Sequence, residues 1–402
     1  MLVMTKRYLQ KLLSILFASI LILISLCLRG FLIINFYNID WQIGHLISMA
    51  HSNERRNTEW NKRHRRKKIT IYCVAGPKAN SYLLEKLKKN IFVTTGQLAS
   101  MLNFLISRCP WISIYDSSDA NFRNYDFANA LVTFTKEEHS VGEAFLGKNS
   151  GSFVCLNVRD SGYNSMIRSE FARNTKDWTQ RNSDVKTYRE ACRVLTSIGV
   201  NVYRMGVQVE KQFGENEDSI FDYATNGTRT EFLDLYLGSR CEFAISTSSG
   251  WDEIPLMFLR PVLLTNCADF LKISNLTANC VIYPKIFVST TTRNIICLDK
   301  SLDLFQNGIR FLNNANLDHL GVEIRELSSE ELVEAVTEMA QRVEGTFVET
   351  PEQKEMQAKL KRILSTHPQL QPSPNFYPIR AQFASCFLSR YPAFINHATH
   401  VV

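Results

Sequence analysis

The chain has 402 residues, of which 45% are apolar and 21% charged, and this composition excludes a disordered or collagen-like polypeptide. At ~100–200 residues per domain, the length favours two globular domains. The formal net charge is +7, but segment 55–68 holds eight basic residues and one acidic residue, and the rest of the chain is balanced. A nucleic-acid binder carries its positive charge on a folded face, so the composition argues against nucleic acid as the main partner.

The first feature along the chain is an apolar segment. Residues 12–28 contain no charged side chain, and apolar residues resume at 31–34. A helix of this length can just cross a hydrocarbon core about 30 Å thick, so residues 1–35 are predicted to be a single-pass membrane anchor embedded through residues 12–34. A cleavable signal peptide is the alternative, but no small-x-small cleavage site follows the run. A buried helix fits less well, because nothing polar interrupts one face.

Charges beside this segment leave its orientation open. Three basic residues precede the run and only Arg29 follows it closely, which places the N-terminus in the cytosol by the positive-inside rule. The basic segment 55–68, inside an expected basic neck at 36–68, favours the opposite orientation, since such clusters favour anionic cytoplasmic lipid. The triplets at Asn226 and Asn275 are glycan acceptors only if the body faces a secretory lumen.

From residue 69 onward, short apolar runs alternate with segments of helical periodicity. The predicted strands lie at 69–74, 112–115, 130–134, 153–158, 200–204, 243–246 and 262–265. The predicted helices lie at 80–90, 185–198, 230–237, 251–258, 328–343 and 352–364. Strands separated by single helices indicate parallel sheets with right-handed crossovers, so the predicted fold class is α/β.

The strand–helix pattern runs twice, before and after about residue 150. It predicts two Rossmann-like domains facing a cleft, the first at 69–150 and the second at 151–325. A helical tail is expected at 326–402. The ten cysteines form no CxxC pair and have no histidine at zinc-finger spacing, so buried free thiols are expected and structural zinc is not supported. One or two disulfides remain open.

Polar residues follow three of the predicted strands at their carboxyl ends, where open α/β sheets bind ligands. Arg159 and Asp160 follow one strand, and Arg204 ends the next. An arginine at such a position suits a phosphate, because its planar guanidinium donates two parallel hydrogen bonds. The alternative is an Arg–Asp ion pair at the surface.

The segment between these two strands ends in four polar residues. Arg181 and Asn182 are candidates for the cleft. Ser183 or Asp184 is expected to cap the helix that follows, a structural role.

The third strand end gives the strongest signal. Residues 246–249 are small hydroxyl residues, Gly250 follows, and a helix begins. This arrangement points backbone N–H groups and hydroxyls at an anion, although an ordinary capped helix is the alternative. The sequence contains no GxxxxGK[ST], GxGxxG, GxSxG or HExxH motif and no clear Asp-x-Asp metal motif, which excludes a P-loop and leaves a dinucleotide site without its fingerprint.

The order of these motifs resembles a bacterial family of glycosyltransferases found among surface-polysaccharide biosynthesis genes. The resemblance covers about residues 40–390. It is carried by Gly44-His45, Pro77-Lys78-Ala79-Asn80, Arg159-Asp160, Arg181-Asn182-Ser183-Asp184, Tyr188, Tyr203-Arg204-Met205-Gly206, the TSSG turn at 247–250, the stretch 255–266, Gly321-Val322-Glu323-Ile324 and the helix at 328–339. One departure is Gln42, where the family is expected to carry an arginine.

This resemblance implies a GT-B glycosyltransferase, distantly similar to fucosyltransferases, that uses a nucleotide-diphosphate sugar. Its C-terminal domain would bind the donor. Arg159 and Arg204 would neutralise the phosphates, and Ser248, Ser249 and the Gly250 amide would cap them. No metal and no cofactor are expected, because arginines and a helix terminus stabilise the departing diphosphate.

The same resemblance implies that the N-terminal domain holds a glycan or lipid-linked acceptor. His45 or Asp160 would act as general base on its hydroxyl, and the sequence does not choose between them. Glu253 would bind a ribose or sugar hydroxyl, or is simply a first-turn acid favoured by the helix dipole. The alternative function is a catalytically inactive, membrane-tethered protein that binds nucleotide sugar or glycan.

Overall fold

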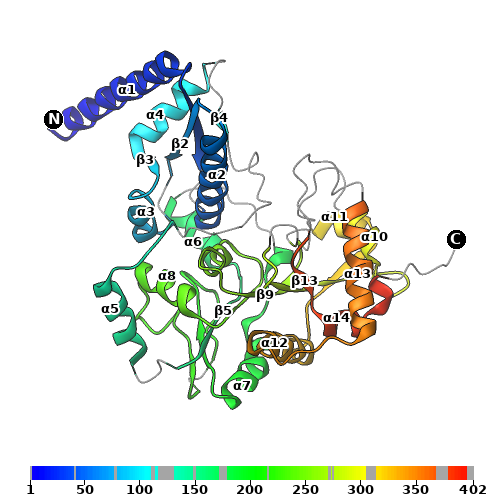
Figure 1. Cartoon of the computed structure of the whole chain (residues 1–402). Coiled ribbons are helices and arrows are strands. Elements are labelled where there is room, and N and C mark those ends of the chain that lie inside the picture. Colours follow the sequence, from blue (N-terminus) through cyan, green and yellow to red (C-terminus); the bar gives the residue numbers. More distant parts are fainter. Residues whose placement is uncertain are drawn as a thin grey trace. The chain divides into compact units, whose positions relative to one another are not determined.

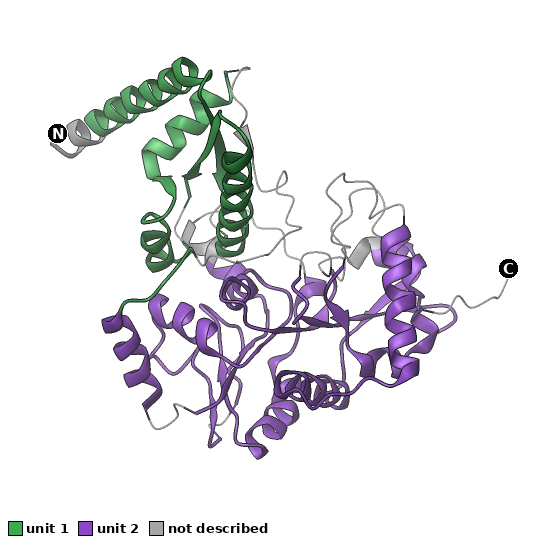
Figure 2. Ribbon diagram, viewed as in Figure 1, with its two compact units in different colours: residues 1–135 green, residues 136–402 purple. Residues whose placement is uncertain are grey.

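The computed structural model (Figure 1) describes residues 2–39, 42–76, 79–109, 114–115, 131–147, 151–171, 179–214, 217–269, 273, 276–304, 314–367 and 379–395. The chain forms two compact units, residues 1–135 and residues 136–402 (Figure 2).

Unit 1 is built on a parallel sheet with the strand order β3-β2-β1-β4. Its strands are β1 (Leu32–Ile39), β2 (Lys67–Val74), β3 (Phe92–Thr95) and β4 (Ile114–Tyr115), and its helices are α1 (Leu2–Leu28), α2 (Ile43–Arg63), α3 (Ser81–Leu87) and α4 (Gly96–Ile106). β1 pairs with β2 along its whole length, from Leu32–Lys67 to Ile39–Val74. The sheet therefore starts only three residues after the apolar helix α1 ends.

The segment 36–68, expected to be a basic neck, is instead part of this folded unit. It contains most of β1, all of α2 and the start of β2. The buried side of α2 carries polar side chains such as His51, Asn53 and Asn57, and Asn57 Nδ2 donates a hydrogen bond to Thr70 Oγ1 in β2 at 3.0 Å. A helix with polar residues at buried positions lacks apolar periodicity, which is why the sequence pattern did not indicate it.

The compact units divide after Thr135 rather than near residue 150. The described residues 131–134, expected as a strand, are irregular, and α5 (Lys136–Leu146) packs on α8 (Glu231–Arg240) of unit 2. This contact is close, because a Cβ at Gly142 would lie 2.2 Å from the Tyr236 ring. Glycine at this position is what lets the two helices approach.

Unit 2 contains a seven-stranded parallel sheet with the order β13-β10-β9-β8-β5-β6-β7. The strands are β5 (Phe153–Asn157), β6 (Asn201–Arg204), β7 (Ile220–Phe221), β8 (Ala244–Ser246), β9 (Val262–Cys267), β10 (Val281–Pro284) and β13 (Gln382–Phe383). From β5 the sheet grows through β6 and β7 on one side and through β8, β9 and β10 on the other, which is the doubly wound Rossmann order. The predicted α/β class with parallel sheets is confirmed.

The helices of unit 2 start at residues suited to helix N-termini. Ser328 and Glu331 form a capping box at α12 (Ser329–Glu344), and Thr350 and Gln353 form another at α13 (Pro351–Thr366). The other helices are α6 (Gly162–Phe171), η2 (Thr179–Arg181), η3 (Val185–Tyr188), α7 (Arg189–Ser197), η4 (Gly250–Asp252), α9 (Glu253–Met257), α10 (Leu298–Leu304), α11 (Asn314–His319), α14 (Ser385–Arg390) and η7 (Pro392–Phe394).

Residues 326–402, expected as a helical tail, belong to the body of unit 2. Helix α12 packs on α7 and β9, and β13 extends the sheet beside β10. A short antiparallel pair, β11 (Ile286–Ser289) with β12 (Val322–Arg325), leads into α12.

All ten cysteines are free thiols, six of them buried, as the sequence predicted. Among the described residues, no group of three His, Cys, Asp or Glu side chains could hold a metal ion. Asn226 is exposed in a turn, whereas Asn275 lies outside the described residues.

Candidate functional site

The carboxyl ends of β5 and β8 form the centre of the candidate site. These strands are neighbours in the sheet although β6 and β7 separate them in the chain, because the order of strands reverses between them. Doubly wound sheets bind ligands in the crevice at such a switch point. Three of the predicted polar segments reach this edge, after β5, β6 and β8.

Hydrogen bonds tie the two strand ends together. Asn157 Nδ2 donates to Ser249 Oγ at 2.6 Å, and the Thr247 N–H donates to the Asn157 carbonyl at 3.2 Å. The Arg159 N–H donates to Thr247 Oγ1 at 2.8 Å. The hydroxyl groups that the sequence assigned to an anion therefore also fix the geometry of this edge of the sheet.

The turn after β8 is held in an uncommon backbone conformation. Ser248 has φ of 65°, in the left-handed region, and a capping box forms between Ser249 and Asp252. The Ser249 N–H donates to Asp252 Oδ2 at 2.9 Å, and the Ser249 hydroxyl accepts from Asn157, so both groups have hydrogen-bond partners within the protein. Gly250 is the first residue of η4, where an N–H has no partner within the helix.

Two arginines lie around this turn. The Arg159 guanidinium donates to Asn182 Oδ1, and Asn182 Nδ2 donates to Ser161 Oγ at 2.8 Å. Arg181 donates from its guanidinium to the Ser248 carbonyl at 2.5 Å. Both arginines are only half-buried, in contrast to a fully buried arginine of the core.

A third cation, Lys285, was missed by the sequence analysis. It follows β10, is 3% exposed, and donates from Nζ to the Asn182 carbonyl at 2.6 Å and to Glu326 Oε1 at 3.3 Å. Burial lowers the pKa of Lys285, and the nearby Arg159 charge adds to this, whereas Glu326 opposes it. The sequence signal for it is the β-branched and aromatic run 281–283, which forms β10 and places Lys285 at the carboxyl end of a strand.

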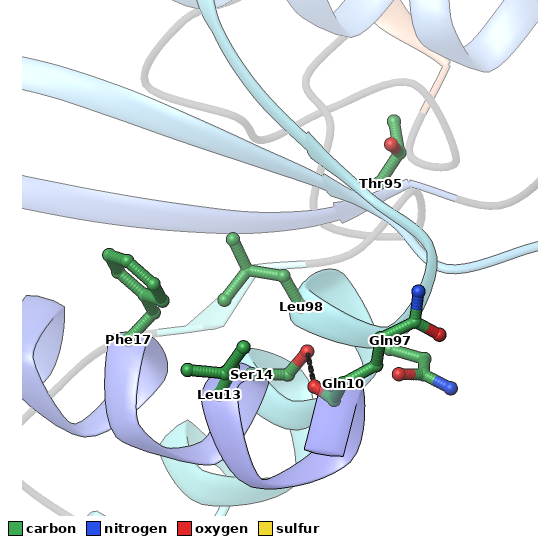
Figure 3. A pocket seen from close by; sticks show the side chains of 7 residues that line it. All are labelled: Gln10, Leu13, Ser14, Phe17, Thr95, Gln97 and Leu98. Atoms are coloured by element: carbon green, nitrogen blue, oxygen red, sulfur yellow. Dashed lines mark hydrogen bonds between the residues drawn. The ribbon is translucent and has the colours of Figure 1, made fainter. Parts of the chain in front are cut away.

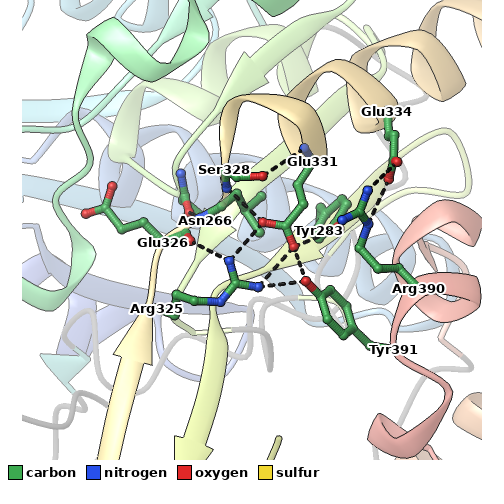
Figure 4. Close-up of polar contacts among 10 residues, drawn as sticks. Asn266, Tyr283, Arg325, Glu326, Ser328, Glu331, Glu334, Arg390 and Tyr391 are labelled. Atoms are coloured by element: carbon green, nitrogen blue, oxygen red, sulfur yellow. Dashed lines mark hydrogen bonds and ion pairs between the residues drawn. The ribbon is translucent and has the colours of Figure 1, made fainter.

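An ionic network around the buried Glu331 carboxylate holds the segment that carries Glu326 (Figure 4). The Leu327 N–H donates to Asn266 Oδ1 at 2.8 Å, and Arg325 donates two hydrogen bonds of 3.0 Å to the two carboxylate oxygens of Glu331. Burial alone would raise the pKa of Glu331, but hydrogen bonds, above all those from Arg325, lower it to about 2. This network therefore holds in place the segment of Glu326, the carboxylate partner of Lys285.

Arg204 lies at the end of β6 but is 0% exposed. Its guanidinium donates to Asp222 Oδ1 at 3.0 Å and to the Lys211 carbonyl at 3.0 Å, and Asp222 Oδ2 accepts from the Phe213 N–H at 2.9 Å. Asp160 Oδ2 lies 4.0 Å from it. The structure therefore gives Arg204 a buried ion-pairing role and not the open position that the sequence analysis expected.

The two candidate bases lie in different units. Asp160 lies in unit 2, where its two oxygens accept hydrogen bonds from the Gly162 N–H at 2.9 Å and the Glu210 N–H at 2.7 Å. Glu253 is buried at the start of α9 in the same unit. His45 lies in unit 1, in the first turn of α2, which follows the carboxyl end of β1.

The sequence matches no described protein family and no curated protein. Among solved structures, the chain is similar to a glycosyl transferase family 9 protein from Veillonella parvula, with a TM-score of 0.41 and 8% identity over 77% of this chain and 98% of that chain. It is also similar to two structures of the Escherichia coli heptosyltransferase WaaC. For WaaC with ADP-2-deoxy-2-fluoro heptose, the TM-score is 0.28 and the identity 8% over 62% of this chain and 92% of that chain. For WaaC with ADP, the TM-score is 0.27 and the identity 9% over 62% of this chain and 90% of that chain. These identities are too low to relate individual residues.

Proposed function

We propose that this chain is a membrane-attached glycosyltransferase that moves a sugar from a nucleotide-diphosphate donor to a glycan or lipid-linked acceptor. The observation that supports it best is the placement of Arg159 and Arg181 at the switch point of a Rossmann-ordered sheet, with Lys285 bonded to the neighbouring Asn182 carbonyl. Cations and a helix start at this position suit a diphosphate. Unit 2 is the donor domain and unit 1 is the acceptor domain in this proposal.

Arg159 and Arg181 bind the diphosphate, together with Ser248 and the Gly250 amide. Arg204 acts indirectly, because it is buried against Asp222 and holds the loop beside the crevice. The positively charged side chains stabilise the diphosphate as it leaves the sugar. They take the role that a metal ion plays in other enzymes.

His45 is the better candidate for the general base that takes the acceptor proton. Both oxygens of Asp160 already accept backbone hydrogen bonds, which favours a structural role for that carboxylate. Glu253 is proposed to reach a ribose or sugar hydroxyl from the start of α9.

The direct test is calorimetric titration of the full-length protein with UDP, GDP, ADP and dTDP and their sugars, with and without EDTA. Binding of one nucleoside diphosphate that survives EDTA is expected. Binding that disappears with EDTA and returns with manganese contradicts the metal-independent site. Tight binding with no sugar transfer to any membrane-extracted acceptor supports the inactive binding protein instead.

A further inference from the structure

Helix α1 has two unlike faces. Its buried stripe combines small and large residues: Ala18 is 0% and Ser25 8% exposed, Ser14 is partly buried, and Ile22, Leu21 and Leu26 pack inward as well. Most of its large apolar side chains point outward, and they are exposed at Leu9, Leu12, Leu13, Ile15, Leu16, Phe17, Ile20, Leu23, Ile24 and Leu28. A surface helix of a water-soluble domain has the reverse arrangement, so the outward face of α1 is suited to an apolar environment.

The inward face of α1 belongs to the core of unit 1. Ala18 and Ile22 pack in one cluster with Phe36 of β1 and with Ala99 and Leu102 of α4. Small residues let two helices approach closely, and α1 lies beside α4 in Figure 1. The second half of α1 is therefore packed on unit 1, whereas residues 8–13 are exposed.

This packing conflicts with a helix that crosses the bilayer. The candidate span, Tyr8–Leu28, includes the same turns that pack on α4 and on β1. If those turns crossed the hydrocarbon core, α4 and the sheet would enter it as well, and the sheet's open edges and polar side chains would lose water. Only three residues join α1 to β1, which leaves no length of chain to separate them.

The surroundings of α1 match the surface of an anionic membrane. Phe31, 80% exposed, follows α1 directly, and its carbonyl accepts from the Lys67 N–H at 2.9 Å, which places the basic run 65–68 beside this end of the helix. On α4, Phe104 is exposed and the Arg108 guanidinium lies 3.7 Å from its ring centre. Exposed apolar side chains next to cations suit a membrane surface, which offers acyl chains to the first and anionic headgroups to the second.

A hollow lies between the N-terminal half of α1 and the start of α4 (Figure 3). It has a volume of about 530 Å³ and a mixed lining, apolar at Leu13, Phe17 and Leu98 and polar at Gln10, Ser14, Thr95 and Gln97. A mixed lining beside an apolar helix face suits the boundary between headgroups and acyl chains.

We propose that α1 lies in the plane of an anionic membrane, with its exposed apolar side chains among the acyl chains and its buried stripe on unit 1. The chain does not cross the bilayer, and the N-terminus and the body lie on the same side. This inference rests on the membrane attachment proposed above, and it replaces a tether with a fixed docking of the acceptor domain at the membrane surface.

Topology decides between an in-plane helix and a spanning one. Full-length protein with an N-terminal epitope is made in bacterial cells, and protease is added to spheroplasts and to inverted membrane vesicles. The in-plane helix predicts that epitope and body are digested together in one preparation and protected together in the other. Digestion of one while the other is protected shows a spanning helix and overturns the proposal, while leaving sugar-nucleotide binding untouched.

Matched substitutions test the two faces of α1. Ala18→Leu, on the inward stripe, is expected to lower the melting temperature of the detergent-solubilised protein by several degrees, whereas Ser19→Leu on the exposed side leaves it unchanged. Leu16→Glu with Leu23→Glu is expected to abolish flotation with vesicles containing phosphatidylglycerol and to keep the melting temperature. Equal melting temperatures for Ala18→Leu and Ser19→Leu, or unchanged flotation of the double variant, contradict the proposed packing.

Discussion

Two neighbouring strand ends carry an arginine, and the structure uses the two arginines differently. Arg204, after β6, is fully buried and paired with the Asp222 carboxylate. Arg159, after β5, is half-buried and donates to the Asn182 amide. A fully buried side chain cannot reach a ligand at the edge of the sheet, whereas a half-buried one keeps part of its surface accessible. The identity and strand position of an arginine therefore do not distinguish a binding role from a structural one.

The largest expected effect is on stability, from Arg204→Ala. This change leaves Asp222 buried without its charged partner and is expected to lower the free energy of unfolding by about 3–5 kcal/mol. Urea denaturation measures it. Arg193→Ala, which removes an exposed arginine with carboxylate partners, is the matched control and is expected to change little. Normal stability of Arg204→Ala together with lost diphosphate binding would reverse the roles assigned here.

The next effect is on binding, from Arg159→Ala. One charge-assisted contact contributes about 1.5–3 kcal/mol. Its loss is expected to weaken the binding of a nucleoside diphosphate on the order of 10- to 100-fold. The free nucleoside should bind equally to both proteins, and the unfolding midpoint should stay unchanged. Arg159→Lys is expected to restore only part of the affinity, because a point charge lacks the planar fork. Equal loss of nucleoside and diphosphate binding would place Arg159 outside the phosphate site.

A smaller effect is expected from the protonation of Lys285. Because burial lowers its pKa below the ordinary 10.5, Lys285 loses its positive charge at a lower pH than a surface lysine. Diphosphate affinity should therefore fall as the pH rises through that lowered pKa. Lys285→Met should bind more weakly at neutral pH and lack this alkaline decline. An identical pH profile in both proteins would exclude Lys285 from the site.

The smallest effect concerns acid stability and Glu331. The pKa of Glu331 in the folded protein is about 2, below the ordinary 4.5. Its contribution to the free energy of unfolding is therefore complete above pH 4.5 and is lost as the pH falls toward 2. Glu331→Gln should be less stable than the wild type at neutral pH, and the difference should shrink over that interval. Denaturation midpoints measured from pH 6 to pH 2.5 test this, and a constant difference contradicts it.

The sequence alone predicted the α/β class and nine elements of unit 2, because those elements depend on local patterns: β5, β6, β8, β9, α7, α8, α9, α12 and α13. The apolar run at 153–157 is a strand covered on both faces, and Ser328 begins α12 with a capping box. Asp184 caps η3 by accepting from the Lys186 N–H at 3.0 Å, as its position indicated. The strand ends that form the switch point also follow from these local patterns.

Tertiary structure alone decided the partners of the polar residues and the inward face of α1. Arg204 meets Asp222 only when the chain returns as β7, and Lys285 meets Asn182 across 103 positions of sequence. Helix α1 is apolar on nearly every side, so its composition does not show which stripe packs on α4. Pairings of this kind depend on strand order and helix packing, which bring together side chains that no local pattern relates.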